Sequence, residues 1–389
     1  MRVCLIANQI AAWGKIGGFG TATRALGSAL ARRGVEVVAV VPRRAAYGQA
    51  RRERLDGVEV FGESAWRTLT GGRIFGEVGA DVFHSQEPTV ASRWAQRAAP
   101  NAIHVVTCRD PRGWRDHLVE LRHATAHRRA RFPVTWLYEV APWVKGAVRK
   151  ADAVLCPAPF LRPVVRRLYG VEARFVPSPV AAPAGRPEKD TRPLVLWVGR
   201  WDPRKRIERF FALAESFPEV RFAAVGRAHD AAHDRRLRRA GSRLTNLEMP
   251  GEASPFGTSG GGPTTGPTLA DWYARAWVLA NTSAREALPY TFLEALAHEA
   301  ALLSPLDPDG VVSRFGEVVE GERYEEGLRR LLAGDAWRER GRRGGAWVRE
   351  VFSEERSARL HLQLYERLLA ERPAGDRAAR RLAAGGRGG

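Results

Sequence analysis

Cysteine is scarce in this chain, and long hydrophobic runs are missing. The 389 residues include three cysteines, Cys4, Cys108 and Cys156, which stand far apart. A disulfide framework or a zinc site needs a larger and more closely spaced set, so both are excluded and a reducing compartment is expected. No apolar run reaches the roughly 18 residues of a membrane-spanning helix. Residues 1–12 also lack the apolar core of a signal peptide, so the sequence predicts a cytoplasmic protein.

Acidic residues are few relative to basic ones. The chain has 62 Lys and Arg against 43 Asp and Glu, a formal net charge of +19. Residues 1–180 hold 28 basic and 14 acidic residues, whereas residues 181–389 hold 34 and 29. A nucleic acid, an anionic membrane surface or a phosphorylated small molecule would be attracted to such a field. The alternative is a surface that is merely well solvated.

Strand-like and helix-like segments alternate along the whole chain. Short apolar runs typical of buried strands occur at residues 2–7, 35–41, 81–84, 103–107, 153–156, 194–198, 221–225, 278–280 and 302–304. Helical spacing of apolar residues occurs at residues 21–33, 207–214, 291–298 and 353–369. This rhythm predicts an α/β fold with two Rossmann-like, doubly wound parallel sheets. Ligands of such sheets bind at the carboxyl ends of the strands, so a cleft between the two domains is expected.

A stretch rich in proline and alanine predicts where the domains divide. We expect a first domain at residues 1–178, a linker at residues 179–193 and a second domain at residues 194–352. A final helix at residues 353–371 is expected to pack back on the first domain. Residues 372–389 have the composition of a disordered tail.

Two glutamates that stand eight apart, Glu286 and Glu294, make the most informative pattern in the second half. Glu286 follows a predicted strand, and Glu294 lies in the first turns of the next predicted helix. Pro289 suits the first turn of that helix, and the backbone N–H groups near Tyr290, Thr291 and Phe292 would form an anion site there. Carboxylates beside a bound phosphate suit sugar hydroxyls, because they accept hydrogen bonds. The alternative is a solvated loop acid and an acid that favours a helix N-terminus.

Two further strand ends carry features that suit a diphosphate. Gly17, Gly18 and Gly20 precede the first predicted helix, where glycine lets the backbone approach a phosphate closely. Their spacing differs from that of dinucleotide dehydrogenases, which are disfavoured. Arg200 and Lys205 follow the first strand of the second domain, and a guanidinium fork with an ammonium suits a diphosphate. A plain tight turn and surface charges are the alternatives.

Three titratable residues end strands of the first domain. His84 ends one strand, and Arg109 with Asp110 ends the next, so all three are expected to face the cleft. Burial in the core is the alternative for His84. Asp307 and Asp309 form an Asp-x-Asp sequence, but no supporting ligand accompanies them, so no metal site is predicted.

The ordered set of these motifs resembles the retaining GT-B glycosyltransferases of family 4 (group 1). The resemblance extends over residues 1–370 and rests on the glycine loop, on Gly199-Arg200 with Lys205, and on the Glu-x7-Glu pair. It implies a transferase that moves a hexose from a UDP- or GDP-linked sugar with retention of the anomeric configuration. It implies no metal and no cofactor, since the nucleotide-diphosphate sugar is itself the donor substrate.

The resemblance also implies roles for the residues. Arg200 and Lys205 would hold the diphosphate, Glu294 the ribose hydroxyls, and Glu286 would face the transferred sugar. The backbone at Gly18 and its neighbours would close over the phosphates from the acceptor domain, residues 1–178. Arg109 stands where many members carry a histidine near the sugar.

Acceptor and alternative functions are open at this stage. A glycan, a lipid-linked sugar or another anionic acceptor is expected, with the basic first domain at the inner face of an anionic membrane. A GT-B epimerase, a glycan phosphorylase and an inactive scaffold homologue are alternatives. A nucleic-acid-binding protein would explain the charge, but no recognition signature is present, so no nucleic acid is expected.

Overall fold

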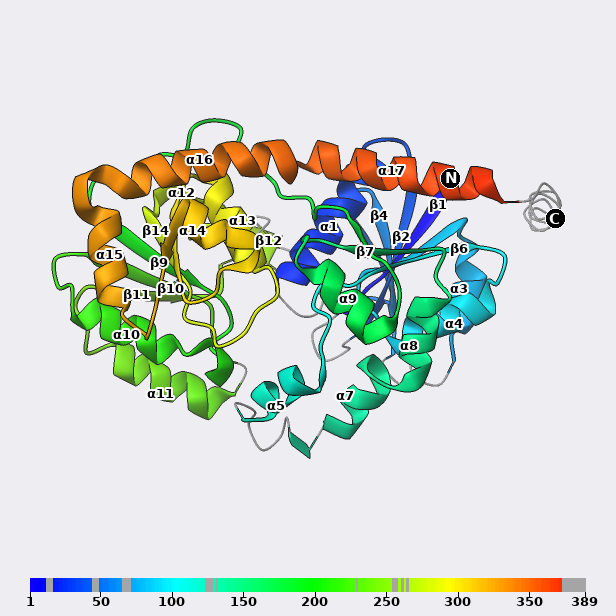
Figure 1. Ribbon diagram of the computed structural model, residues 1–389, viewed down its shortest axis with the longest axis horizontal. Coiled ribbons are helices and arrows are strands. Elements are labelled where there is room, and N and C mark those ends of the chain that lie inside the picture. The colour runs from blue at the N-terminus through cyan, green and yellow to red at the C-terminus, as the bar shows by residue number, and fades with distance from the viewer. Residues whose placement is uncertain are drawn as a thin grey trace.

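The fold consists of two α/β domains, seen side by side in the computed structural model (Figure 1). The structure describes residues 1–11, 17–43, 49–64, 71–122, 129–130, 132–228, 230–253, 258–259, 262–263 and 266–372. The predicted tail, apart from Arg372, lies outside these residues. None of the helices in these ranges combines the length and hydrophobicity that crossing a membrane requires.

The first domain is built on an eight-stranded sheet in the order β3-β4-β2-β1-β5-β6-β7-β8. All neighbouring strands are parallel except β3, which pairs antiparallel with β4. The strands are β1 (Arg2–Ile6), β2 (Glu36–Pro42), β3 (Arg52–Leu55), β4 (Val58–Glu63), β5 (Val82–Ser85), β6 (Ile103–Thr107), β7 (Ala153–Cys156) and β8 (Arg174–Phe175). The helices are α1 (Gly18–Ala31), α3 (Arg73–Val78), α4 (Val90–Ala98), α5 (Trp114–Arg122), α7 (Phe132–Glu139), α8 (Pro142–Arg149) and α9 (Leu161–Tyr169).

The second domain contains a six-stranded, wholly parallel sheet in the order β11-β10-β9-β14-β15-β16. The strands are β9 (Leu194–Val198), β10 (Arg221–Val225), β11 (Leu247–Gly251), β14 (Val278–Ala280), β15 (Ala301–Ser304) and β16 (Gly316–Val318), with a separate ribbon of β12 (Thr258–Ser259) and β13 (Gly262–Pro263). The helices are η2 (Pro203–Lys205), α10 (Ile207–Glu215), α11 (Ala231–Gly241), α12 (Leu269–Arg275), α13 (Tyr290–Ala297), η3 (Pro308–Gly310), α14 (Val311–Phe315), α15 (Tyr324–Leu332), η4 (Ala333–Asp335), α16 (Ala336–Val351) and α17 (Glu354–Glu371).

Both sheets reverse their strand order at one point, and these points fix where ligands bind. In each sheet, the first strand of the domain lies between its second strand and a strand from the other half of the domain, as β1 lies between β2 and β5. A crevice opens at the carboxyl ends of strands where the order reverses. The predicted fold class, two Rossmann-like parallel-sheet domains, is therefore confirmed.

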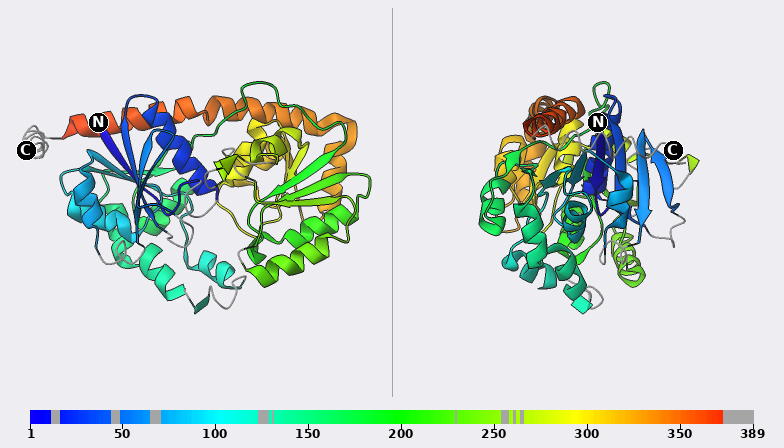
Figure 2. Two further views of the ribbon diagram at one scale, coloured as in Figure 1. Left: turned by 180° about the vertical axis from the view of Figure 1, so that it is seen from behind. Right: turned by 90° about the vertical axis from the view of Figure 1, so that its right-hand side faces the viewer.

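The last helix returns to the first domain. α17 buries Ala358, Leu364 and Tyr365 in the core that β1 and α1 also line. α16 and α17 lie end to end along one side of both domains (Figure 2). The chain therefore crosses between the domains twice, and the two crossings are paired: the Val180 N–H donates to the Phe352 carbonyl at 2.8 Å.

Candidate functional site

A cleft of about 700 Å³ separates the carboxyl edges of the two sheets. Most of the predicted site residues line it: Gly17, Gly18, Asp110, Arg200, Lys205, Glu286, Pro289, Tyr290, Thr291 and Glu294. They come from both domains and from loops far apart in the sequence. Gly20, Arg109 and His84 do not line it.

Two helix N-termini, one from each domain, meet in this cleft. Gly18 begins α1 and Tyr290 begins α13. A Cβ added at Gly18 would lie 2.6 Å from the Tyr290 Cβ, so a side chain there would force the domains apart. The first turn of a helix leaves its backbone N–H groups without helical partners and carries a partial positive charge. The meeting point of α1 and α13 is therefore suited to an anion such as a phosphate.

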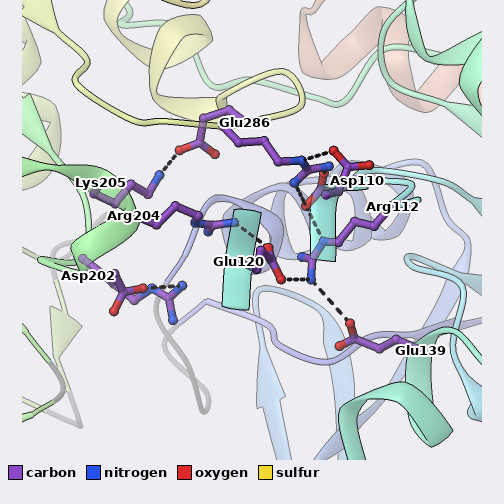
Figure 3. Close-up of polar contacts among 11 residues, drawn as sticks. Asp110, Arg112, Glu120, Glu139, Asp202, Arg204, Lys205 and Glu286 are labelled. Carbon is purple, nitrogen blue, oxygen red and sulfur yellow. Dashed lines mark hydrogen bonds and ion pairs between the residues drawn. The ribbon is translucent and has the colours of Figure 1, made fainter. Parts of the chain in front are cut away.

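A lysine and a glutamate from neighbouring loops form an ion pair at the cleft wall. Lys205 ends η2, and its Nζ donates to Glu286 Oε1, in the loop between β14 and α13 (Figure 3). Both side chains are largely buried. Burial alone would raise the pKa of Glu286, but the charges of Lys205 and Arg204 outweigh it and hold that pKa below its ordinary value. Glu286 is therefore a carboxylate at neutral pH.

Close backbone packing shapes the loop that carries Arg200. Gly199 follows β9 with φ of 155° and Gly226 follows β10 with φ of 137°, both in the region that favours glycine. A Cβ on Gly226 would lie 1.9 Å from the Gly199 carbonyl oxygen. Arg200 follows this contact, and its Nη2 lies 3.1 Å from the Asp202 carboxylate. The guanidinium is thereby kept at the rim of the cleft.

Glu294 projects from α13 and has one strong partner among the described residues. The Tyr273 hydroxyl donates to Glu294 Oε2 at 2.9 Å. Burial raises the pKa of Glu294 to about 7, and the hydrogen bond from Tyr273 offsets this only in part. Burial thus favours the protonated carboxyl, and a ligand that donates hydrogen bonds to it would favour the charged form.

An ion-pair network crosses the cleft beside Glu286. Arg285 Nη2 lies 2.8 Å from Asp110 Oδ1, and Arg285 Nε lies 2.7 Å from Asp116 Oδ1. Arg112 Nε is 2.9 Å from Asp110 Oδ2. Burial would raise the pKa of Asp110, but Arg112 and Arg285 outweigh it and hold the pKa well below its usual range. A carboxyl held so firmly ionised is poorly suited to accept a proton.

The same network includes a second contact between the domains. Arg204 Nη1 lies 2.8 Å from Glu120 Oε1, and Glu120 Oε2 is 3.2 Å from Arg112 Nη1. Arg112 also lies 3.6 Å from Glu139, on α7 (Figure 3). Charged side chains of α5 and α7 therefore connect to the loops that carry Lys205 and Glu286.

Arg109 and His84 make contacts behind the cleft. Arg109 donates to the Gln86 carbonyl at 3.2 Å and to Ser178 Oγ at 2.8 Å, and only 5% of it is exposed. His84 is fully buried, with Nδ1 2.6 Å from the Tyr365 hydroxyl and Nε2 2.7 Å from Thr107 Oγ1. His84 thus joins β5 and β6 to α17. The catalytic roles expected for both residues stay predictions.

Gly20 also lies behind the cleft. Its carbonyl accepts from the Ala11 N–H at 3.0 Å, which ties the start of α1 to the loop after β1.

Sequence reasoning missed Glu87, which lines the first domain's side of the cleft. Asn8 Nδ2 donates to Glu87 Oε2 at 2.5 Å. Burial, and then the charge of Glu139, raise the pKa of Glu87 to about 7. The signal was present, because Glu87 lies two residues after the end of β5 and the strand-edge rule that selected His84 applies to it as well.

Asp307 and Asp309 both bind backbone donors. Asp307 Oδ1 accepts from Val312 at 2.7 Å, at the start of α14, and Asp309 Oδ1 accepts from Phe160 at 2.9 Å, in the first domain. Within the described ranges, no group of three or more His, Cys, Asp or Glu residues is arranged to hold a metal ion.

Comparisons with known proteins agree with this architecture. The family model described as Glycosyltransferase Family 4 matches residues 16–182. The chain is similar in structure to sucrose-phosphate synthase from Thermosynechococcus elongatus, with a TM-score of 0.73 and 19% identity, over 95% of this chain and 100% of that chain. No curated protein is similar enough in sequence to count as a match.

Two further similar structures contain nucleotides. HepE from Anabaena in complex with UDP-glucose has a TM-score of 0.64 and 13% identity, over 95% of this chain and 100% of that chain. The catalytic domain of starch synthase IV from Arabidopsis thaliana, bound to ADP and acarbose, has a TM-score of 0.63 and 12% identity, over 95% and 99%. At such identities the likeness shows the fold, which is the GT-B architecture.

Proposed function

We propose that this protein is a glycosyltransferase that takes a sugar from a nucleotide-diphosphate donor. The observation that carries the proposal is the convergence in one cleft of two helix N-termini with Arg200, Lys205, Glu286 and Glu294. The family match over residues 16–182 supports it. So do the similar structures that are complexes with UDP, UDP-glucose or ADP.

The donor would lie along the second domain. Arg200 and Lys205 provide the charge to bind a diphosphate, together with the first-turn N–H groups of α13. Glu294, on the rigid helix α13, would accept hydrogen bonds from the ribose hydroxyls. Glu286, ionised and closer to Lys205, would face the transferred sugar.

The reaction would break the bond between the anomeric carbon and the diphosphate oxygen. An acceptor hydroxyl would form the new bond on the same face of the sugar and lose its proton to the departing nucleoside diphosphate. Attack on that face would retain the anomeric configuration. The protein's contribution would be to stabilise the charge on the leaving group, since arranged cations and helix N-termini do this in place of a nucleophile. Lys205 and Arg200 would make a metal unnecessary.

The acceptor would enter from the first domain. Asn8, Gln9, Glu87 and Tyr138 line that side and offer polar atoms suited to the hydroxyl groups of a glycan. A sugar or lipid-linked glycan in the cytoplasm would fit this arrangement.

Calorimetric titration with UDP, GDP and ADP tests the donor site. Lys205→Ala should weaken binding of the preferred nucleotide by about tenfold or more, because a charge-assisted contact contributes about 1.5–3 kcal/mol. Lys150→Ala, on the surface of the first domain, is the matched control and should bind as the wild type does. Absence of binding by all three nucleotides would overturn the proposal.

A further inference from the structure

Exposed hydrophobic side chains gather on two helices of the first domain. Apart from Met1, every exposed large hydrophobic residue in the described ranges lies on α5 or α7. These residues, called here the apolar patch, are Trp114, Leu118, Val134, Trp136 and Leu137. Trp114 is 68% exposed and Val134 52%, in a protein whose other large apolar side chains are mostly covered. An apolar cluster at the surface marks an interaction site more often than isolated residues do.

The charges of α5 are sorted between its two faces. Trp114, Leu118 and Arg122 follow one another at intervals of four, so they share one face of the helix. Asp116 and Glu120 lie on the opposite face, where they bind Arg285 and Arg204 of the second domain. The acids are therefore turned inward and neutralised, while the outer face keeps its cations.

The cations of this face are available to an external partner. Arg115 and Arg122 are exposed, and in the described part of the chain no carboxylate forms an ion pair with either of them. The Arg115 guanidinium lies over the Trp114 ring at 5.4 Å, so charge and apolar surface are presented together. The segment 109–150 has 10 basic and 4 acidic residues. All four acids, Asp110, Asp116, Glu120 and Glu139, take part in the ion-pair network of the cleft.

The apolar patch continues into the cleft. Val134 belongs to the patch and also lines the cleft, as its neighbours Thr135 and Tyr138 do. α5 and α7 project at the lower edge of the molecule in Figure 1, on the side away from α16 and α17. The ring contact of His117 with Phe132, at 5.8 Å between centroids, holds the two helices against each other.

We propose that the apolar patch and the arginines beside it dock the protein on an anionic lipid bilayer. Tryptophan and leucine side chains insert at the boundary of headgroups and acyl chains, and arginines attract the acidic headgroups. A protein partner would more often cover such a patch with a complementary acidic surface of its own, whereas a bilayer needs only shallow insertion and diffuse charge. Docking would turn the cleft mouth toward the lipid, so that a lipid-borne acceptor would reach it. That last consequence rests on the proposed function, whereas vesicle binding does not.

Vesicle flotation tests the docking surface with no nucleotide present. The full chain should float with vesicles of phosphatidylcholine and phosphatidylglycerol in equal parts. It should remain in the bottom fraction when the vesicles are pure phosphatidylcholine. High salt should weaken binding, because it screens the charges. Arg115→Glu with Arg122→Glu, and separately Trp114→Ser with Leu118→Ser, should each lower the partition coefficient by about tenfold or more. Arg239→Glu with Arg342→Glu, exposed in the second domain, makes the same charge change and should bind as the wild type does.

Three results would overturn the inference. The first is that the wild-type chain does not bind anionic vesicles. The second is equal weakening by the control pair, which would assign binding to net charge alone. The third is a dimer, seen by light scattering, that the Trp114→Ser and Leu118→Ser pair separates, because a second copy would then cover the patch. Thermal unfolding of each variant confirms that its fold is retained.

Discussion

Arg285 of the second domain donates hydrogen bonds to Asp110 of the first domain from both terminal nitrogens, at 2.8 and 3.3 Å. Its remaining nitrogen donates to Asp116. Arg285 immediately precedes Glu286, so the residue that holds the domains together is covalently joined to a residue of the proposed site. Closure of the cleft and placement of Glu286 are therefore linked.

Removing the ion pairs of Arg285 should destabilise the protein. Arg285→Ala leaves Asp116 without its arginine and Asp110 with Arg112 alone, and we expect the free energy of unfolding to fall by about 2 kcal/mol. Thermal unfolding followed by circular dichroism measures it. Arg330→Ala breaks the pair of the solvent-exposed Arg330 with Glu317 and should cost much less, because water screens the charge of an exposed arginine. If both substitutions lowered the free energy of unfolding equally, the ion pairs across the cleft would stabilise the protein no more than an ion pair at the surface does.

Glu294→Gln should weaken nucleotide binding. The substitution keeps the size of the side chain but removes the charge that would accept from two hydroxyls, so we expect an affinity about tenfold lower. Calorimetry with the preferred nucleoside diphosphate measures this. Glu339→Gln, on the exposed side of α16, is the control. If Glu294→Gln bound the ribonucleotide as tightly as the wild type, the ribose role would be wrong.

The stability of the protein should depend on the protonation of Glu87. Its pKa is raised to about 7 in the folded chain, above the ordinary value of 4.5, so the folded state holds the proton more tightly than the unfolded state. The stabilisation of the folded state by protonated Glu87 is fully present below about pH 4.5 and is lost as the pH rises through about 7.

Glu87→Gln removes that titration. Relative to the wild type, the unfolding free energy of the variant should rise between pH 5 and pH 8, by about 2–3 kcal/mol. Denaturant titrations at the two pH values measure it, with the exposed Glu36→Gln as control. A variant with the wild-type pH profile would refute the raised pKa.

Gly18→Ala should hold the cleft partly open. The added Cβ would meet the Cβ of Tyr290 at 2.6 Å, a distance that requires one helix to move. We expect weaker nucleotide binding, by about tenfold, together with a larger radius in small-angle scattering. Gly146→Ala, where nothing lies within 4 Å, is the control. An unchanged radius with unchanged affinity would mean that the two helix N-termini need not meet.

Much of the architecture could be predicted from the sequence, because parallel strands buried on both faces appear as short apolar runs. The runs at β6, β7, β9, β10 and β14 were predicted with the bounds that the structure has. The hairpin of β3 and β4 was not predicted. It lies at the sheet edge, where Arg52, Glu53 and Arg54 interrupt any apolar pattern.

The helix α16 shows why some elements escape sequence analysis. It contains Gly341, Gly344 and Gly345, which disfavour a helix locally. A Cβ at Gly341 would lie 2.1 Å from the Glu299 carbonyl oxygen, and one at Gly344 would lie 2.4 Å from a Leu296 methyl carbon. Tertiary packing thus requires the residues that helix propensity opposes.

The strand-edge rule gathered most of the predicted site residues in one cleft, but it could not assign their contacts. Asp110 and Arg109 both follow β6, yet one faces Arg285 in the cleft and the other turns to Gln86 and Ser178 behind it. Side-chain direction at a strand end depends on partners from other elements, such as Arg285, which no local pattern indicates.

Incubation with a panel of UDP-, GDP- and ADP-linked sugars, followed by mass spectrometry, shows whether the cleft binds a sugar donor. With no acceptor supplied, water can take the acceptor's place, and we expect one nucleotide sugar to yield its nucleoside diphosphate and free sugar. Glu286→Ala should abolish this release while the nucleotide still binds. If every nucleotide sugar stays intact and no nucleoside diphosphate binds the protein, the account of this cleft as a donor site is contradicted.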